Sequence, residues 1–171
     1  MSTLYLLIGG NQGDRLQTIT QAADLIRQRI GSVVACSRIY ETAPWGVFAN
    51  GEKPQNFYNQ ALEVATLLSP HEALKEALET ERMLGRRRSH GKAGTQGYAS
   101  RPIDIDLICY DRLVIDTPDL TLPHPRMHLR RFVLQPMCDI APYYNHPILN
   151  KTLTELLNEC TDTSSCLCCS Q

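Results

Sequence analysis

Hydrophobic side chains recur along this chain with two different spacings, which predict strands in some segments and helices in others. Leu4 to Ile8 is a continuous apolar run that ends at Gly9-Gly10-Asn11. Such a run is typical of a central strand that is covered on both faces. Further strands are expected at about residues 33–40, 59–68 and 103–110, with a short partner at 113–115.

Between these strands, apolar residues return every three or four positions and predict two amphipathic helices, at about residues 14–31 and 69–85. The second begins with Ser69-Pro70-His71-Glu72, the pattern of a capping box with proline in the first turn. Glu81 falls on its apolar stripe, so that carboxylate is either exposed at the helix end or held by a partner. The rest of the stripe is Leu74, Ala77 and Leu78.

The order β-α-β-β-α-β predicts an α+β fold, namely a ferredoxin-like sandwich with an antiparallel sheet. Additional C-terminal helices are expected at about residues 127–136 and 151–159. With helices on one side of the sheet, the other face would be free for a site. We expect one domain over residues 1–158, because the sequence contains no linker and no internal repeat.

Residues 159–171 are expected to form a disordered, cysteine-rich tail. They contain four of the seven cysteines, and Cys166 and Cys169 have the C-x₂-C spacing of half a zinc site. No histidine lies near them, so a disordered tail is the preferred interpretation.

Charge and hydropathy narrow the class of partner. The formal net charge is −1, whereas a general nucleic-acid binder would be strongly basic. No apolar run approaches the roughly 20 residues that span a bilayer, and no secretory leader is recognisable. We therefore expect a cytoplasmic protein with no nucleic-acid, membrane or obligate protein partner. The local basic clusters, Arg86–Arg88 and Arg130-Arg131, suit a small anionic ligand.

The clearest candidate for chemistry is the pair Asp104 and Asp106. The alternation in residues 103–108 puts three apolar side chains on one face of a strand and both carboxylates on the other. Two carboxylates about 6.5–7 Å apart along one strand suit Mg²⁺, which binds one or two carboxylates together with phosphate oxygens. The alternative is a solvated outer face of the sheet.

A polar, glycine-rich loop of about 15 residues, 86–100, precedes these aspartates and is longer than a compact domain usually tolerates without a function. Arginines at both ends of the loop, Arg86–Arg88 and Arg101, could neutralise a phosphoryl group once the loop closes. The alternative is that they are simply solvated. His124 is fixed between two prolines, and its spacing to His128 is not accepted as a zinc pair because Pro125 interrupts the helix.

Several separated segments, taken together, resemble the family of 6-hydroxymethyl-7,8-dihydropterin pyrophosphokinases, which act in folate synthesis. The similarity runs from about Leu4 to Leu157. The segments that carry it are Ile8-Gly9-Gly10-Asn11, Tyr40-Glu41-Thr42-Ala43-Pro44-Trp45-Gly46, Phe57-Tyr58-Asn59, Glu81-Arg82-Met83-Leu84-Gly85-Arg86, Arg101-Pro102-Ile103-Asp104-Ile105-Asp106, and Leu122-Pro123-His124-Pro125 through Arg130-Arg131-Phe132.

The resemblance implies transfer of pyrophosphate from ATP, the co-substrate, to a reduced hydroxymethyl-pterin. It implies that Asp104 and Asp106 bind two Mg²⁺ ions and that Arg86 and Arg101 assist the transfer. The residues implied around the nucleotide are Glu81, Arg88, Leu107, Thr121, His124 and Arg130. Those implied around the pterin are Thr42, Ala43, Trp45, Asn59 and, stacked on its two faces, Phe57 and Phe132. The chain departs from the family at Tyr98-Ala99-Ser100-Arg101-Pro102, where R-W-G-P-R-T is usual, and in the length of the loop.

Two other classes of function are weighed against this one. A magnesium-dependent nucleotidyltransferase would carry its glycine pair and aspartates close together, whereas Gly10 and Asp104 lie far apart in this sequence. An RNA-binding module would need aromatic residues on neighbouring strands and a basic surface. The chain has only one tryptophan, three phenylalanines and seven tyrosines, so this class is disfavoured.

Overall fold

The computed structural model describes residues 1–44, 55–86 and 100–169 of the chain. Its centre is a six-stranded sheet in the order β5-β1-β4-β3-β8, in which β2 also pairs with β4 and all neighbours are antiparallel. A separate ribbon pairs β6 with β7. The strands are β1 (Ser2–Gly10), β2 (Ser32–Cys36), β3 (Tyr40–Thr42), β4 (Phe57–Thr66), β5 (Asp104–Tyr110), β6 (Ile115–Asp116), β7 (Thr121–Leu122) and β8 (Cys166–Cys168).

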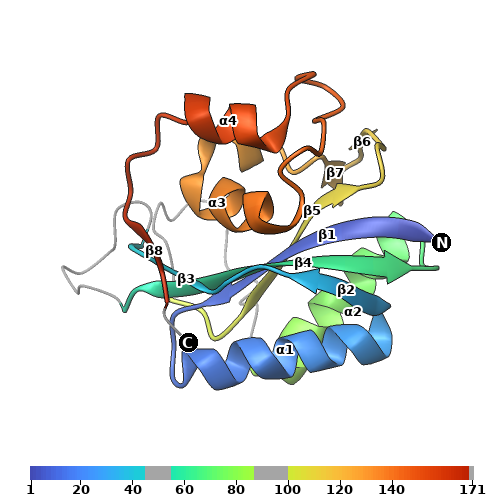
Figure 1. Ribbon diagram of the computed structural model, residues 1–171. Coiled ribbons are helices and arrows are strands. Elements are labelled where there is room, and N and C mark those ends of the chain that lie inside the picture. Colours follow the sequence, from blue (N-terminus) through green and yellow to red (C-terminus); the bar gives the residue numbers. More distant parts are fainter. Residues whose placement is uncertain (45–54, 87–99, 170–171) are drawn as a thin grey trace.

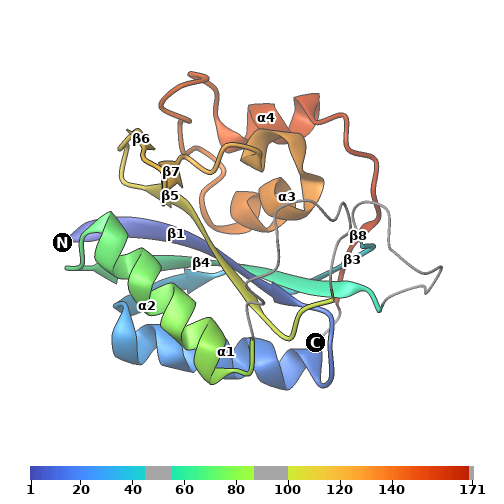
Figure 2. The same cartoon turned by 180° about the vertical axis from the view of Figure 1, so that it is seen from behind.

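Helices lie on both faces of the sheet (Figures 1 and 2). The helices α1 (Arg15–Arg29) and α2 (Pro70–Met83) cover one face, and α3 (Arg131–Ile140) and α4 (Leu153–Glu159) cover part of the other. The predicted capping box at the start of α2 is confirmed, because Ser69 and Glu72 each bond the other's backbone N–H. Among the described residues, no helix is both long and apolar enough to cross a membrane.

The buried side chains form two clusters, one on each side of β1. Leu4, Leu6 and Ile8 belong to the cluster beneath α1 and α2, whereas Leu7 belongs to the cluster that contains the apolar residues of α3 and α4. This two-sided burial explains the unbroken apolar run of β1, as expected. The expectation that the second face would be entirely free is wrong, since α3 and α4 bury Val133, Leu134, Met137, Leu153 and Leu156 there.

Two elements differ in detail from the sequence expectation. The strand predicted at 33–40 is divided into β2 and β3, because the Ser37 hydroxyl accepts a 2.9 Å hydrogen bond from the Ala61 N–H in place of a backbone carbonyl. The buried face of α2 is rotated relative to the predicted stripe. It consists of Ala73, Ala77, Thr80 and Glu81.

The C-terminal segment is ordered where we expected disorder. Strand β8 pairs with β3, with Cys166 opposite Thr42 and Cys168 opposite Tyr40, and the N–H of Cys169 donates to the Ile39 carbonyl at 2.9 Å. Composition did not reveal this strand because its pairing uses backbone groups, which every residue in it carries. The expectation of a disordered tail is therefore corrected for residues 160–169.

Candidate active site

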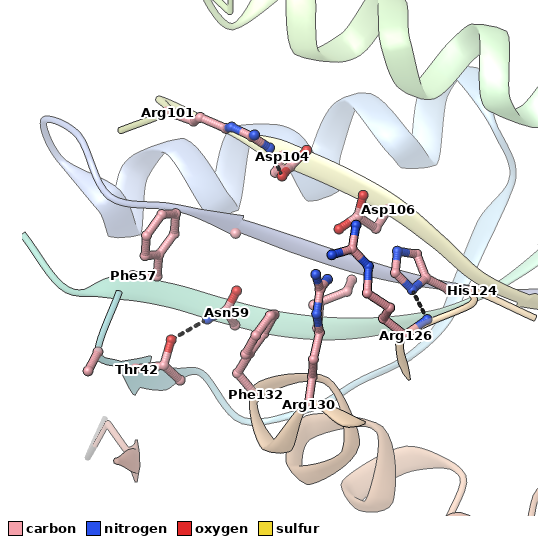
Figure 3. A pocket seen from close by; sticks show the side chains of 13 residues that line it. Thr42, Phe57, Asn59, Arg101, Asp104, Asp106, His124, Arg126, Arg130 and Phe132 are labelled. Carbon is pink, nitrogen blue, oxygen red and sulfur yellow. Dashed lines mark hydrogen bonds and ion pairs between the residues drawn. The ribbon is translucent and has the colours of Figure 1, made fainter. Parts of the chain in front are cut away.

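The site is built around Gly9, near the end of β1. In the sheet register Gly9 lies opposite Asn59 of β4 on one side and opposite Asp104 of β5 on the other. A Cβ atom at Gly9 would lie only 2.3 Å from the Asn59 Oδ1, so a side chain here would displace that amide. A cavity of about 250 Å³ opens over this point, between the sheet and the start of α3 (Figure 3).

One wall of the cavity carries an amide and two phenyl rings. The Asn59 Nδ2 donates a 2.7 Å hydrogen bond to the Thr42 Oγ1, and both residues are buried. Phe57 from β4, Phe132 from α3 and Ala43 complete this wall. The structure thus brings together every residue predicted for the pterin except Trp45, which lies outside the described residues.

The opposite wall carries Asp104, which two guanidinium groups hold. The Arg86 Nη1 lies 2.5 Å from the Asp104 Oδ1, and the Arg101 Nη1 lies 2.6 Å from its Oδ2. The same Arg86 nitrogen lies 2.5 Å from the Glu81 Oε1. Arg86 and Arg101, which flank the predicted loop in the sequence, therefore meet at one aspartate.

The carboxylate of Glu81, which was expected to be either exposed at the helix end or held by a partner, is held by partners. It is only 1% exposed, and its Oε1 accepts a 2.8 Å hydrogen bond from the backbone N–H of Ile105, the residue between the two aspartates. Together with the Arg86 contact, this bond satisfies a buried charge that would otherwise be costly. Glu81 thereby joins the end of α2 to the strand that carries Asp104 and Asp106.

Asp106 lies deeper in the same wall, and its environment suits a bound cation. Burial raises its pKa to about 7, and the charges of Asp104 and Glu81 add to the rise, against Arg130 and Arg101. Within the described part of the chain, no group of three or more acidic, histidine or cysteine side chains could hold a metal alone. A pair of carboxylates fits Mg²⁺, because that ion completes its shell with phosphate oxygens and water.

His124 closes the cavity as a neutral imidazole. Burial and the neighbouring charges of Arg130 and Arg126 lower its pKa to about 4. Its Nδ1 accepts a 3.3 Å hydrogen bond from the Arg126 N–H, which leaves Nε2 as the protonated nitrogen and a donor. Its own backbone N–H donates to the Ile108 carbonyl at 2.8 Å and fixes the segment to β5.

A larger groove adjoins this cavity and shares Asp106 and His124 with it. It runs between α2 and the segment that contains β7. The predicted nucleotide residues Glu81, Leu107 and Thr121 line it together with Arg86, which was predicted to assist the transfer, whereas Arg130 lines the smaller cavity. Arg88, also predicted for the nucleotide, lies outside the described residues, as does most of the loop expected to close.

Sequence reasoning missed two contributors to the site. Arg126 lines the cavity, and only its place within the segment from Leu122 to Phe132 could have indicated it. Asn11 is 2% exposed, and its side chain holds the ends of two separate segments by donating to the Gln55 carbonyl and the Ser100 Oγ at 3.1 and 3.3 Å. The signal for Asn11 was its position directly after the paired glycines.

An antiparallel sheet that carries paired carboxylates among arginines, beside a pocket with an amide and two phenyl rings, defines an enzyme of the phosphoryl-transfer class. The sequence model of the family "7,8-dihydro-6-hydroxymethylpterin-pyrophosphokinase (HPPK)" matches residues 5–142. The chain belongs to this family.

Curated relatives cover nearly the whole chain. The 2-amino-4-hydroxy-6-hydroxymethyldihydropteridine pyrophosphokinase of Porphyromonas gingivalis is 38% identical over 149 residues, which are 86% of this chain and 95% of that protein. The Aquifex aeolicus protein of the same name is 34% identical over 169 residues, 99% of this chain and 98% of its own length.

Solved structures share the fold at lower identity. The HPPK-DHPS protein of Plasmodium falciparum crystallised with pteroate has a TM-score of 0.72 and 17% identity, over 92% of this chain. This chain spans 42% of that longer chain, so the likeness applies to the fold of the matched part alone.

Proposed function

We propose that this protein transfers the β,γ-diphosphoryl group of ATP to 6-hydroxymethyl-7,8-dihydropterin, forming AMP and the pterin diphosphate in folate biosynthesis. The observation that carries the proposal is the placement of Asn59 and Asp104 on the two sides of Gly9. Asn59 and Asp104 thus face one cavity, with only Gly9 between them. The amide can recognise a flat heterocycle, and the carboxylate can bind a metal ion. The names of the relatives support the same reaction.

The pterin is proposed to occupy the wall formed by β3, β4 and α3. Phe57 and Phe132 would stack on its two faces, since a flat ring system gains from aromatic contact on both sides. Asn59, held by Thr42, would pair with the amide-like edge of the ring, for which it has both donor and acceptor groups. Ala43 and Trp45 would contact the same edge.

ATP is proposed to lie in the adjoining groove, with its phosphates at the junction of the two hollows. Asp104 and Asp106 would hold Mg²⁺, and the family resemblance implies two such ions. Bound Mg²⁺ would neutralise phosphate charge. Arg101 and Arg130 from the cavity, with Arg86 from the groove, would contact the phosphate oxygens. Neutral His124 would donate from Nε2. Leu107 and Thr121 would contact the adenosine, and Arg88 and Glu81 complete the proposed nucleotide set.

In the proposed step, the hydroxymethyl oxygen of the pterin forms a bond to the β-phosphorus while the bond from that phosphorus to the α,β-bridging oxygen breaks. AMP leaves with the bridging oxygen, and the hydroxyl proton passes to solvent. Little covalent chemistry falls to the protein in such a transfer, so catalysis rests on positioning and on charge stabilisation. The arginines and the rigid sheet positions around Gly9 can supply both.

We further assign the fold to the ferredoxin-like type, supported by the order β5-β1-β4 followed by β2 and β3, with α1 and α2 on one face. We take residues 1–158 as the catalytic domain, to which β8 adds an edge strand. The cytoplasmic location stays a prediction.

A turnover assay with ATP, Mg²⁺ and the reduced hydroxymethyl-pterin tests the function. Formation of AMP and pterin diphosphate in equal amounts is the expected result. Release of free pyrophosphate with a nucleotidylated pterin would instead identify a nucleotidyltransferase and overturn the proposal. Omission of the pterin serves as the control for simple ATP hydrolysis.

A further inference from the structure

The C-terminal segment contacts α3 and β3, two of the three elements that carry the proposed pterin pocket. We define the C-terminal clamp as residues 160–169, which run from the end of α4 to the end of β8 (Figure 1). Its first half contacts the start of α3, where Phe132 lies. Its second half pairs with β3, where Thr42 lies. This inference rests on the proposed function and adds a positioning role to it.

Asp162 makes the contact with α3. Its Oδ2 accepts a 3.0 Å hydrogen bond from the backbone N–H of Arg131, the first residue of the helix, and its carbonyl accepts a 3.0 Å bond from the Arg131 Nε. No side chain next to α3 in the sequence caps this helix end. Asp162 therefore supplies from a distance the acceptor and the negative charge that a helix N-terminus favours.

Asp162 is itself held in place and charged. Ser164 donates to its Oδ1 through both the backbone N–H and the hydroxyl. Burial alone would raise the pKa of Asp162, but the hydrogen bonds from Ser164 and from the Arg131 N–H outweigh it and lower the pKa below its ordinary value. The Ser164 bonds thus hold the carboxylate in place independently of its contact with α3.

Strand β8 makes the contact with β3. Cys166 lies opposite Thr42, the residue that bonds Asn59, so the three-residue strand β3 is paired on both edges, by β4 and by β8. The far end of α3 is tied to the same region independently, because Asp139 accepts hydrogen bonds from the Tyr40 hydroxyl at 3.0 Å and from the Arg38 Nη2 at 2.6 Å. Helix α3 and strand β3 are therefore joined at both ends, and Asp162 is the tie nearer to Phe132.

We propose that Asp162 is a positioning residue for the pterin pocket, which sets the place of Phe132 against β3 by holding the first turn of α3 to the clamp. It touches neither substrate. Its loss should therefore affect recognition of the pterin and leave recognition of ATP, on the other side of the site, nearly unchanged.

The test compares steady-state kinetics and calorimetric binding of both substrates in full-length variants. Asp162→Ala removes the helix cap. Loss of this cap should raise the KM and the Kd for the pterin about five-fold. The ATP constants should stay within about two-fold. Asp162→Asn keeps one acceptor oxygen for the Arg131 N–H but turns its amide nitrogen toward the Ser164 donors, so it should restore pterin binding in part, to a value between wild type and Asp162→Ala. Glu159→Ala, which breaks the exposed pair with Lys151, is the matched control and should change neither substrate.

If Asp162→Ala does not fold, Ser164→Ala decides the question, because it removes one of the bonds that orient Asp162 and should raise the pterin KM selectively. Normal pterin binding in the alanine variant, or equal loss for both substrates, would overturn the inference. A wild-type chain that forms no AMP contradicts the proposed function instead. An active wild type with an unaffected Asp162→Ala variant contradicts only the positioning role.

Discussion

Asn11 and Arg101 are joined by a reciprocal pair of hydrogen bonds. The backbone N–H of Arg101 donates to the Asn11 Oδ1 at 2.8 Å, and the N–H of Asn11 donates to the Arg101 carbonyl at 3.0 Å. This pair sets the backbone of Arg101 against the end of β1, and the guanidinium of Arg101 then reaches Asp104 at 2.6 Å. The residue after the paired glycines thus places an arginine that is 90 positions away in sequence.

Asn11→Ala should lower kcat about tenfold, because it removes one of the two bonds that hold the Arg101 backbone and leaves a part-buried N–H without its acceptor, a loss of about 1–3 kcal/mol. The KM values should change less, since Asn11 does not line the cavity. Steady-state kinetics measure both constants. Asn158→Ala, at an exposed position on α4, is the control, and an equal effect of the two variants would contradict the positioning of Arg101 by Asn11.

Arg101→Ala should slow the chemical step more than it weakens binding of either substrate. Its guanidinium lies at Asp104, beside the proposed position of the transferring phosphates, so the loss should fall mainly on the transition state. Single-turnover kinetics combined with binding measurements separate the two effects. Arg27→Ala removes an arginine whose only shown pair, with Asp24, is exposed on α1, and it should behave as wild type. Equal losses in binding and chemistry for Arg101→Ala would argue for a purely binding role.

Asp106→Ala and Asp104→Ala should each abolish turnover by removing a proposed ligand of Mg²⁺, and removal of the metal with EDTA should do the same to the wild type. Each variant should fold, because the apolar face of β5 is formed by other residues. Thermal melting checks folding, and AMP formation checks activity. Asp116→Ala, on the exposed part of β6, is the matched control. Near-full activity in either variant would exclude that aspartate from the mechanism.

Phe132→Ala should weaken pterin binding by about 1–3 kcal/mol, the range for loss of an aromatic stacking platform. ATP affinity should change much less, because the phenyl ring lines the cavity and not the adjoining groove. Isothermal titration calorimetry with each substrate gives the comparison. Tyr143→Ala, which removes an aromatic ring that is 86% exposed, should change neither value. The reverse pattern would show that Phe132 does not contact the pterin.

Asp139 should make stability depend on pH. Burial would raise its pKa, but hydrogen bonds from Arg38 and Tyr40 outweigh this effect and lower the pKa below its ordinary value. The unfolded chain, with an aspartate pKa of about 3.9, takes up the proton first, so the stabilisation is complete at neutral pH, begins to decline near pH 4 and is lost as the pH falls through the lower pKa of the folded state. Asp139→Asn should therefore lower the melting temperature more at pH 6 than at pH 3. An equal loss of melting temperature at the two pH values would contradict a stabilising role for the charged Asp139 carboxylate.

The sequence predicted the parts of the fold that depend on side-chain pattern. The two-sided burial of β1 followed from its unbroken apolar run, and the start of α2 followed from Ser69 and Glu72. The break between β2 and β3 could not be foreseen, because it depends on a hydroxyl of Ser37 that replaces a backbone acceptor on a neighbouring strand. The pairing of β8 with β3 was not predicted for a similar reason, since it relies on main-chain groups.

For the candidate site, the sequence identified side-chain chemistry but not the way the groups are held. Asp104 and Asp106 followed from alternation along one strand, and the pocket residues followed from the family resemblance. The bond from the Ile105 N–H to Glu81 could not be predicted, because it depends on the register between a helix and a strand 24 positions apart in sequence. The raised pKa of Asp106 has the same origin, since burial and neighbouring charges arise only in the folded protein.

Register along β4 has a practical consequence for joining this chain to another protein. Ser2 lies opposite Thr66 at one end of the strand, whereas Phe57 lies at the other end, with β3 and β8 beside it. A tag or partner fused ahead of Ser2 would therefore leave the sheet about a full strand length away from the proposed pterin pocket. One fused after β8 would emerge next to Ile39 and Tyr40, at the start of the strand that carries Thr42, and pull on the edge that shapes the pocket. An N-terminal fusion is the geometry that leaves substrate access undisturbed.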